Sequence, residues 1–292
     1  MKDILRLVRP YQWSKNLFIF LPLFFDKQLD NHALLIRLVI VFIAFSIIAS
    51  GVYCLNDLCD VKSDRMHPVK KNRPIASGSV STRTAVILMM GCWMAGFGIL
   101  YFSGNPSRFE EMQVVMIYLL MNIAYCFWIR HLAIMDVMVI AVGFVLRIWI
   151  GGVAANILLS EWIVLMTFLL ALFLAFAKRR DDLVLYESTG LKMRKKTDRY
   201  NMVFMNQVLT ILATITMVAY IMYTVSPEVT QRFGSKRVYL TSFFVLAGIL
   251  RYLQLSLVDA KSGSPTKILM KDRFIQSCIG GWLCLFYWLI YN

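Results

Sequence analysis

Residues 42–60 read FIAFSIIASGVYCLNDLCD, and this stretch joins two opposite kinds of sequence. An apolar run long enough to enter a bilayer ends in Asn56, Asp57 and Asp60, and Asp64 follows four residues later. Ionisable groups beside hydrocarbon are costly unless they serve a site or reach water. The stretch therefore predicts a helix that crosses a membrane and carries a polar cluster at its mouth.

The rest of the chain has the composition of a membrane protein. Of its 292 residues 59% are hydrophobic, and the mean hydropathy is +0.64, far outside the usual range of soluble domains. Reading apolar runs of about 17 to 25 residues as spanning helices, we expect an all-α, polytopic integral membrane protein that folds as a single domain over residues 1–292. The nine expected helices lie at 12–29, 34–57, 84–103, 112–128, 133–154, 162–178, 203–224, 238–257 and 274–291.

The basic residues predict the orientation of the chain. Lys and Arg number 23 in the N-terminal segment, at Arg130 and in the loops 58–83, 178–202 and 258–273, against six in the connections on the other side. The positive-inside rule then places the N-terminus and these loops in the cytoplasm. The net charge of +14 follows from the same bias and from attraction to anionic lipids. No basic module interleaved with aromatic residues surrounds it, so no nucleic acid partner is expected.

Cysteine and histidine do not point to a metal site. The six cysteines are scattered without a C-x-x-C pair, and the three histidines are far apart in the sequence. Neither set has the spacing of a zinc site. A metal site in this chain would therefore have to be built from oxygen ligands.

The acidic cluster fits a magnesium ion that carries a diphosphate. On a helix that continues past the apolar run, Asn56, Asp60 and Asp64 lie at i, i+4 and i+8, with Asp57 one turn before Asp60, so their oxygens share a face. Repulsion makes such a face unfavourable alone, whereas Mg²⁺ typically takes one or two carboxylates together with substrate phosphates. The cations expected to hold the remaining phosphate oxygens are Arg65, Lys70, Lys71 and Arg73.

A second polar cluster, AFAKRRDDLVLYE at residues 175–187, ends the sixth expected helix. Four crossings separate it from the first cluster, so both emerge on the same cytoplasmic face, and Lys178 faces Asp182 at i+4. Each cluster alone is equally well explained as a solvated helix end with a surface ion pair. Two such clusters on one face favour a shared anion site.

A diphosphate leaving group needs charge neutralisation rather than a proton-transfer base, which agrees with the scarcity of histidine. The clusters leave the donor undecided, because a prenyl diphosphate and a phosphoribosyl diphosphate present the same diphosphate. Arg147, in the apolar stretch AVGFVLRIWIGG, is costly in hydrocarbon and should face the bundle interior in a functional role, with snorkelling as the alternative. Gly151 and Gly152 are expected to allow close helix packing.

The pattern N-D-x-x-D-x-x-x-D at residues 56–64, closed by RPIASG at 73–78, resembles the first signature of the UbiA-type intramembrane prenyltransferase superfamily. Nine helices agree with the fold of that superfamily. Within it, the chain most resembles the decaprenyl-phosphate phosphoribosyltransferase branch. The stretches that carry this resemblance are RPYQWSKN (9–16), residues 125–147 with GFVLR, LAFAKRRDDL (174–183), RYL (251–253) and KDR (271–273).

The resemblance implies a reaction and its participants. Enzymes of this branch transfer the 5-phosphoribosyl group of phosphoribosyl diphosphate to a polyprenyl phosphate in the bacterial inner (plasma) membrane, releasing diphosphate, for cell-envelope glycan precursors. The implied cofactor is Mg²⁺. An acceptor phosphate is already anionic and needs no general base. The oligomeric state is left open, with a homo-oligomer among the options.

The resemblance also gives roles to residues by position. The implied Mg²⁺ ligands of the first cluster, which are also its implied catalytic residues, are Asp57 and Asp60. The implied catalytic residues of the second cluster are Arg179 and Asp182. The implied substrate-binding residues are Lys15, Asn16, Asn56, Asp64, Arg65, Arg73, Lys178, Asp136 and Arg147. Of these, Arg147 is expected to contact phosphate or Asp136. One departure stands in the second signature, where this branch usually has Glu, as KRRxE, and this chain has Asp182.

Two other functions stay open at this point. A prenyltransferase would move a prenyl group from a prenyl diphosphate to an aromatic or other small acceptor. The D-x-x-x-D pattern of such enzymes is approached here only by Asp182 and Glu187, which miss its spacing by one. A transporter or lipid scramblase would use the same charges to gate an anionic substrate, and its flux would survive Asp57→Asn, whereas either enzyme would lose most of its activity.

Overall fold

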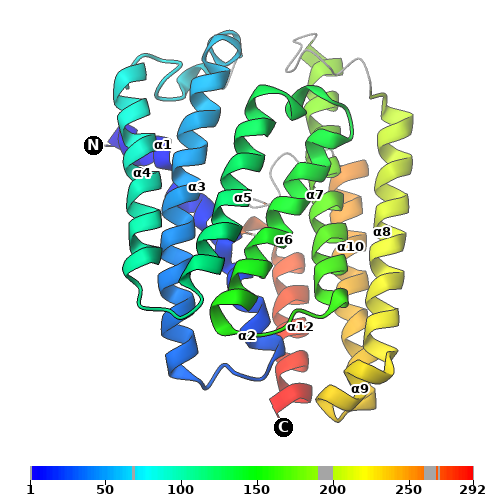
Figure 1. Cartoon of the computed structure of the whole chain (residues 1–292). Coiled ribbons are helices and arrows are strands. Elements are labelled where there is room, and N and C mark those ends of the chain that lie inside the picture. Colours follow the sequence, from blue (N-terminus) through cyan, green and yellow to red (C-terminus); the bar gives the residue numbers. More distant parts are fainter. Residues whose placement is uncertain (1, 68–69, 190–199, 260–267, 269, 292) are drawn as a thin grey trace. The chain divides into compact units, whose positions relative to one another are not determined.

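The computed structural model describes residues 2–67, 70–189, 200–259, 268 and 270–291, and every regular element within these ranges is a helix (Figure 1). The all-α prediction is therefore confirmed. The chain divides into two compact units, Met1–Leu159 and Ser160–Asn292, and each is described by itself. That the two units act as one domain stays a prediction. Most basic residues of the loops 178–202 and 258–273, on which the predicted orientation partly rests, lie outside the described residues.

The first unit is built around one long helix. Its elements are α1 (Lys2–Val8), η1 (Pro10–Phe20, a 3₁₀ helix), α2 (Leu21–Phe25), α3 (His32–Met66), η2 (Lys70–Asn72), α4 (Thr82–Phe102), α5 (Arg108–Phe127), η3 (Ile129–His131) and α6 (Met135–Ala155). The side chain of Asn31 caps the start of α3 by accepting a hydrogen bond from the Leu34 backbone, 3.3 Å. From there α3 runs through the apolar stretch and the acidic cluster without a break. The prediction of a helix that continues past its apolar run is confirmed.

The second unit contains α7 (Glu161–Thr189), α8 (Met202–Val225), α9 (Pro227–Phe233), η5 (Lys236–Thr241), α10 (Ser242–Leu257) and α12 (Arg273–Tyr291). Helices α7 and α8 pack along each other, as do α10 and α12 (Figure 1). Inside this unit the Tyr220 hydroxyl contacts Thr241 Oγ1 at 2.7 Å and accepts a hydrogen bond from Trp282 Nε1 at 2.6 Å. These bonds satisfy polar groups that would otherwise be costly to bury.

Seven helices in the described ranges are long and apolar enough to cross a membrane. They match seven of the nine expected spans, and α5 occupies the expected position of an eighth, although its first turn carries Glu110 and Glu111. The expected span at 12–29 is not one long α-helix but η1 followed by α2. Pro22 lies in the first turn of α2 and has no backbone N–H to continue a ladder of helical bonds from η1. Sequence hydropathy does not register that interruption.

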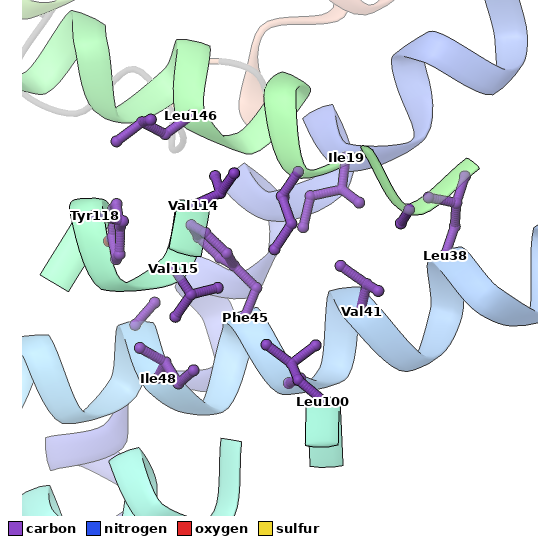
Figure 2. Packing of buried hydrophobic residues seen from close by; sticks show 14 of the residues in the cluster. Ile19, Leu38, Val41, Phe45, Ile48, Leu100, Val114, Val115, Tyr118 and Leu146 are labelled. Carbon is purple, nitrogen blue, oxygen red and sulfur yellow. The ribbon is translucent and has the colours of Figure 1, made fainter. Parts of the chain in front are cut away.

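The core of the first unit gathers side chains from six elements, namely η1, α2, α3, α4, α5 and α6. Figure 2 shows Ile19 of η1, Phe45 and Ile48 of α3, Leu100 of α4, Val115 of α5 and Leu146 of α6 converging on one cluster. Phe45 is fully buried, and its ring lies 4.7 Å from that of Tyr118 between centroids. Such rings contribute both apolar area and a favourable ring contact. The cluster fixes α3 relative to η1 and α6, and α3 carries the acidic residues.

Two glycines allow backbones to come close in this unit. A Cβ atom on Gly96 of α4 would lie 2.3 Å from the Ile48 side chain, and one on Gly151 of α6 would lie 2.0 Å from the backbone oxygen of Ile19. Real Cβ atoms do not approach other atoms so closely, so both positions require glycine. The expectation that Gly151 allows close packing is confirmed, and its partner is the backbone of η1.

Phe45→Ala is expected to destabilise the first unit by about 3–5 kcal/mol, because it removes a fully buried ring and leaves a cavity. Thermal unfolding of the purified protein in detergent measures the effect. Phe102→Ala is the matched control, since Phe102 is 83% exposed on the same unit. Equal shifts in the two variants would contradict the packing described here.

Candidate active site

The polar residues at the end of α3 divide into two pairs that face different neighbours. At about 100° per residue, Asp57 and Asp64 lie about 20° apart around the helix, and Asn56 and Asp60 lie about 40° apart. The first pair meets Arg73, while the second faces α5 and η3. The four residues cover an arc of about 100°, and the two halves of this arc meet different neighbours.

Asp57 lies between two arginines. Its Oδ1 atom accepts hydrogen bonds from Arg9 Nη2 at 2.5 Å and from Arg73 Nη1 at 3.1 Å, and Arg73 Nη1 also reaches Asp64 Oδ2 at 2.8 Å. Asp57 is only 2% exposed. Burial disfavours the charged form of Arg9, but the Asp57 carboxylate outweighs this and raises the pKa of the guanidinium above its usual value. Two cations thus compensate a carboxylate that is otherwise costly to bury.

Asp60 and Asn56 contact the helix pair on the other side. Asp60 Oδ1 accepts a hydrogen bond from Arg130 Nη1 of η3, and Asn56 Oδ1 accepts one from Cys126 Sγ of α5 at 2.9 Å. Asp60 is more open than Asp57, with a side chain that is 35% exposed. A ligand arriving from water therefore meets Asp60 first and Asp57 beneath it.

The residues at this site fit a magnesium ion. Asp57 Oδ2 is buried and has no hydrogen-bond partner in the structure, and an oxygen in that state is costly unless a cation or donor reaches it. Within the described ranges no three His, Cys, Asp or Glu side chains gather closely enough to hold a metal ion. Asp57 and Asp60 would supply one or two carboxylates, which is the set that Mg²⁺ uses when phosphates and waters complete its shell.

The RPIASG segment folds back onto α3. Arg65 Nε donates to the Ala76 backbone oxygen at 3.3 Å, and Gly78 adopts a left-handed backbone with φ of 82° that favours glycine. Arg65 thus stabilises this turn. The turn places Arg73 in direct contact with Asp57 and Asp64, and the structure thereby brings the three side chains together.

Asn16 and Arg147 contact each other deep in the first unit. Arg147 Nε donates to Asn16 Oδ1 at 2.8 Å, and its other nitrogens reach the Gly143 backbone oxygen at 2.5 Å and the Tyr118 hydroxyl at 3.2 Å. The predicted direct pair with Asp136 is not formed, because eleven residues of α6 separate the two side chains by about 16 Å along the helix. Asp136 is buried at the start of α6, and Lys15 is half-buried on η1.

In the second unit, the KRRDD segment lies inside α7. Arg179 Nη1 donates to Asp182 Oδ2 at 3.5 Å, one helical turn on, and Lys178 is exposed. Arg180 points to another part of the unit, where it donates to Asn206 Oδ1 at 2.8 Å and to the backbone oxygens of Ser256 and Leu257. These two carbonyls end α10, so Arg180 caps that helix.

Two other stretches of the predicted resemblance meet in this unit. Arg251, in RYL, donates through Nε and Nη2 to Asp272 Oδ2, in KDR, at 3.2 and 2.8 Å. These hydrogen bonds hold the pKa of the Asp272 carboxyl below its usual range. Asp272 Oδ1 also accepts from the Ile275 backbone at 2.9 Å and so caps α12. Arg251 therefore ties the body of α10 to the start of α12.

Sequence reasoning did not single out Arg9 and Arg130, which the structure places against Asp57 and Asp60, nor Arg180, which caps α10. Arg9 begins RPYQWSKN and Arg130 is one of the basic residues on the predicted cytoplasmic side, but no local sequence pattern indicates a partner 48 or 70 residues away. Their position at the predicted membrane edge was the one available signal. That position indicates that the arginines lie on the predicted cytoplasmic side, but it does not indicate which carboxylates they contact.

The apolar helices make the chain an integral membrane protein. Residues 18–278 match the UbiA prenyltransferase family, so the chain belongs to this family of transferases. A protein named decaprenyl-phosphate phosphoribosyltransferase from Mycolicibacterium smegmatis is 32% identical over 97% of this chain and 91% of its own length. One of the same name from Corynebacterium glutamicum is 29% identical over 96% and 84%.

A solved structure supports the predicted fold. It is that of a UbiA homologue from Archaeoglobus fulgidus bound to GPP and Mg²⁺. It aligns with a TM-score of 0.69 over 99% of this chain and 100% of that one, at 18% sequence identity. The expected UbiA fold is confirmed.

Arg180→Gln is expected to loosen the end of α10, whereas Arg179→Gln is not. Losing hydrogen bonds from a buried charged group costs about 1.5–3 kcal/mol, and only Arg180 donates to Ser256 and Leu257. Hydrogen exchange of the amides at 254–257 reports the difference. The assignment of Arg180 as a cap is wrong if both variants exchange equally fast there.

Proposed function

We propose that the protein transfers the 5-phosphoribosyl group of phosphoribosyl diphosphate to a polyprenyl phosphate and releases diphosphate. The product would serve cell-envelope glycan synthesis, at a bacterial plasma membrane with the N-terminus and the charged loops in the cytoplasm. The support from relatives is that two proteins named decaprenyl-phosphate phosphoribosyltransferase are similar across almost the whole chain. The structural observation that carries the proposal is Asp57, a buried carboxylate with one unpartnered oxygen between two arginines.

Asp57 and Asp60 are the proposed Mg²⁺ ligands. When bound, the ion would neutralise charge on the diphosphate as the bond to carbon breaks. That a UbiA homologue binds GPP together with Mg²⁺ supports a metal-assisted diphosphate site in this family. Asp64 holds Arg73 in place through its 2.8 Å contact, and Asn56 stands beside Asp60 at the same mouth.

Arginines supply the rest of the positive charge. A guanidinium has five N–H donors in a planar fork, so Arg73 can keep a carboxylate and still donate to a phosphate oxygen. The Arg73 side chain is 27% exposed and can reach a ligand from water. Lys15 is assigned to the same phosphate groups. That Lys178, Arg179 and Asp182 bind the donor stays a prediction from the sequence. Paired N–H groups hold phosphate oxygens in defined geometry.

The chemistry needs no proton-transfer base. An oxygen of the acceptor phosphate, already anionic, forms a bond to the anomeric carbon of the ribose while the bond from that carbon to the diphosphate breaks. The electron pair of the broken bond stays on the diphosphate. Cationic side chains that stabilise this charge lower the barrier, because they are oriented before the reaction begins.

Membranes that contain the protein are expected to convert phosphoribosyl diphosphate, labelled in the ribose, into a lipid-extractable product when Mg²⁺ and polyprenyl phosphate are present. Chelation of the metal should abolish the reaction and added Mg²⁺ should restore it. If the label stays in water while prenyl diphosphate is consumed with an aromatic acceptor, the enzyme is instead a prenyltransferase of the same family. Flux of an anion without any transfer would favour a transporter.

Asp57→Asn and Asp60→Asn are each expected to lower turnover by about 10²–10³, the usual cost of removing one group that stabilises developing charge. The matched control is Asp3→Asn, which also removes a carboxylate paired with an arginine but on the exposed helix α1. Turnover by the three variants, measured at equal amounts of folded protein, separates the roles. Wild-type rates in Asp57→Asn would overturn the assignment.

A further inference from the structure

The N-terminal helix η1 has an unusual geometry. It keeps a 3₁₀ conformation over eleven residues, Pro10–Phe20, whereas such helices rarely exceed three or four residues because their hydrogen bonds are poorer. The residue before it, Arg9, has a left-handed backbone with φ of 51°, which is strained for a residue with a side chain. Local preference therefore does not explain this segment, so contacts with the rest of the unit must hold it.

Three side-chain contacts tie this segment to α3 in antiparallel register. Arg9 bonds to Asp57, Trp13 Nε1 donates to Ser50 Oγ at 3.0 Å, and Asn16 Nδ2 donates to Ser46 Oγ at 2.8 Å. On α3 the distance from position 46 to 57 is about 16 Å. Seven residues of 3₁₀ helix cover about 14 Å, while seven residues of α-helix would cover only about 10 Å. The 3₁₀ rise therefore matches the spacing of the three partners on α3 more closely than an α-helical rise would.

Two contacts fix the other side of η1 against α6. Arg147 donates to Asn16 Oδ1, so the Asn16 side chain is held by protein groups at both its oxygen and its nitrogen, and it is only 2% exposed. Further along, the backbone oxygen of Ile19 lies where the Cβ of any larger residue at 151 would stand. A side chain can rotate away from such a clash but a backbone cannot. The contacts at Asn16 and at Gly151 therefore fix the position of η1 along the axis of α3.

We infer that η1 is a positioning element for the donor site, and that Asn16, Arg147 and Gly151 act through it by holding Arg9 against Asp57. These three residues are thereby positioning residues in place of the phosphate contacts expected for Asn16 and Arg147. The inference rests on the proposed function only in treating Asp57 as part of a diphosphate site. The seating of η1 itself is independent of the reaction.

Substitutions at Asn16 distinguish positioning from ligand binding. In Asn16→Asp, the carboxylate can still accept from Arg147, and the Ser46 hydroxyl can rotate to donate to it, so the seating of η1 should survive. A phosphate ligand at this position would instead repel the anion after the same change. Asn16→Leu removes both contacts while keeping a side chain with the same number of heavy atoms, branched at Cγ.

The measurement is the affinity of the full-length protein in lipid nanodiscs for inorganic pyrophosphate with Mg²⁺, together with hydrogen exchange of the amides at 11–20. Gly151→Ala and Asn16→Leu should weaken pyrophosphate binding about 10- to 100-fold, since displacements near 1 Å can cost that much, and should speed exchange in η1. Asn16→Asp should stay within about threefold of wild type in affinity. Gly98→Ala is the benign control, since a Cβ there meets nothing within 4 Å.

Gly96→Ala controls for general loss of packing, because its clash is with Ile48 on α3 and not with η1. The inference is overturned if Asn16→Asp loses affinity as severely as Asn16→Leu, or if Gly151→Ala weakens binding no more than Gly96→Ala. Unchanged exchange of η1 in Gly151→Ala would overturn it as well. If the wild type does not bind pyrophosphate, the proposed function is contradicted instead. The hydrogen-exchange data would still show whether Gly151 and Asn16 hold η1 in position.

Discussion

A carboxylate buried at the end of a membrane helix is the constraint from which much of the first unit follows. Asp57 is 2% exposed, and a charge removed from water at that depth requires partners. Arg9 arrives from the N-terminal segment and Arg73 from the turn after α3. Each arginine depends on its own support, since η1 holds the first and the RPIASG turn, closed by Arg65, holds the second. One charge thus organises segments from three parts of the sequence.

Adjacent arginines on α7 show that a basic cluster need not have a single purpose. Arg179 lies beside Asp182, while Arg180 satisfies the last carbonyls of α10 and the amide of Asn206. Successive residues on a helix point about 100° apart, so one can serve a ligand while the next serves the fold. Arg251 likewise ties the body of α10 to the start of α12 through Asp272. A sequence motif that resembles a family signature can therefore contain both residues that serve the reaction and residues that stabilise the fold.

The sequence predicted what depends on local pattern. Hydropathy located the long helices, and the spacing of Asn56, Asp57, Asp60 and Asp64 correctly required α3 to continue past its apolar run. It did not predict that these residues divide between two neighbours, because the direction of each contact depends on where Arg73, Arg130 and Cys126 lie in space. The 3₁₀ form of η1 was also beyond reach, since tertiary contacts and not propensity stabilise it. The pairing of Asn16 with Arg147 spans 131 residues and leaves no periodic signal.

The close approach at Gly151 has a consequence for reading related sequences. Because the Ile19 backbone fills the space of a Cβ, a chain with a larger residue at the equivalent of 151 must route its N-terminal segment differently. Loss of that glycine should then coincide with loss of the Asn–Arg pair equivalent to Asn16 and Arg147, as correlated change across homologues. The residue at position 151 would thereby indicate, from sequence alone, whether a homologue positions its N-terminal arginine against the carboxylate as Arg9 is positioned against Asp57.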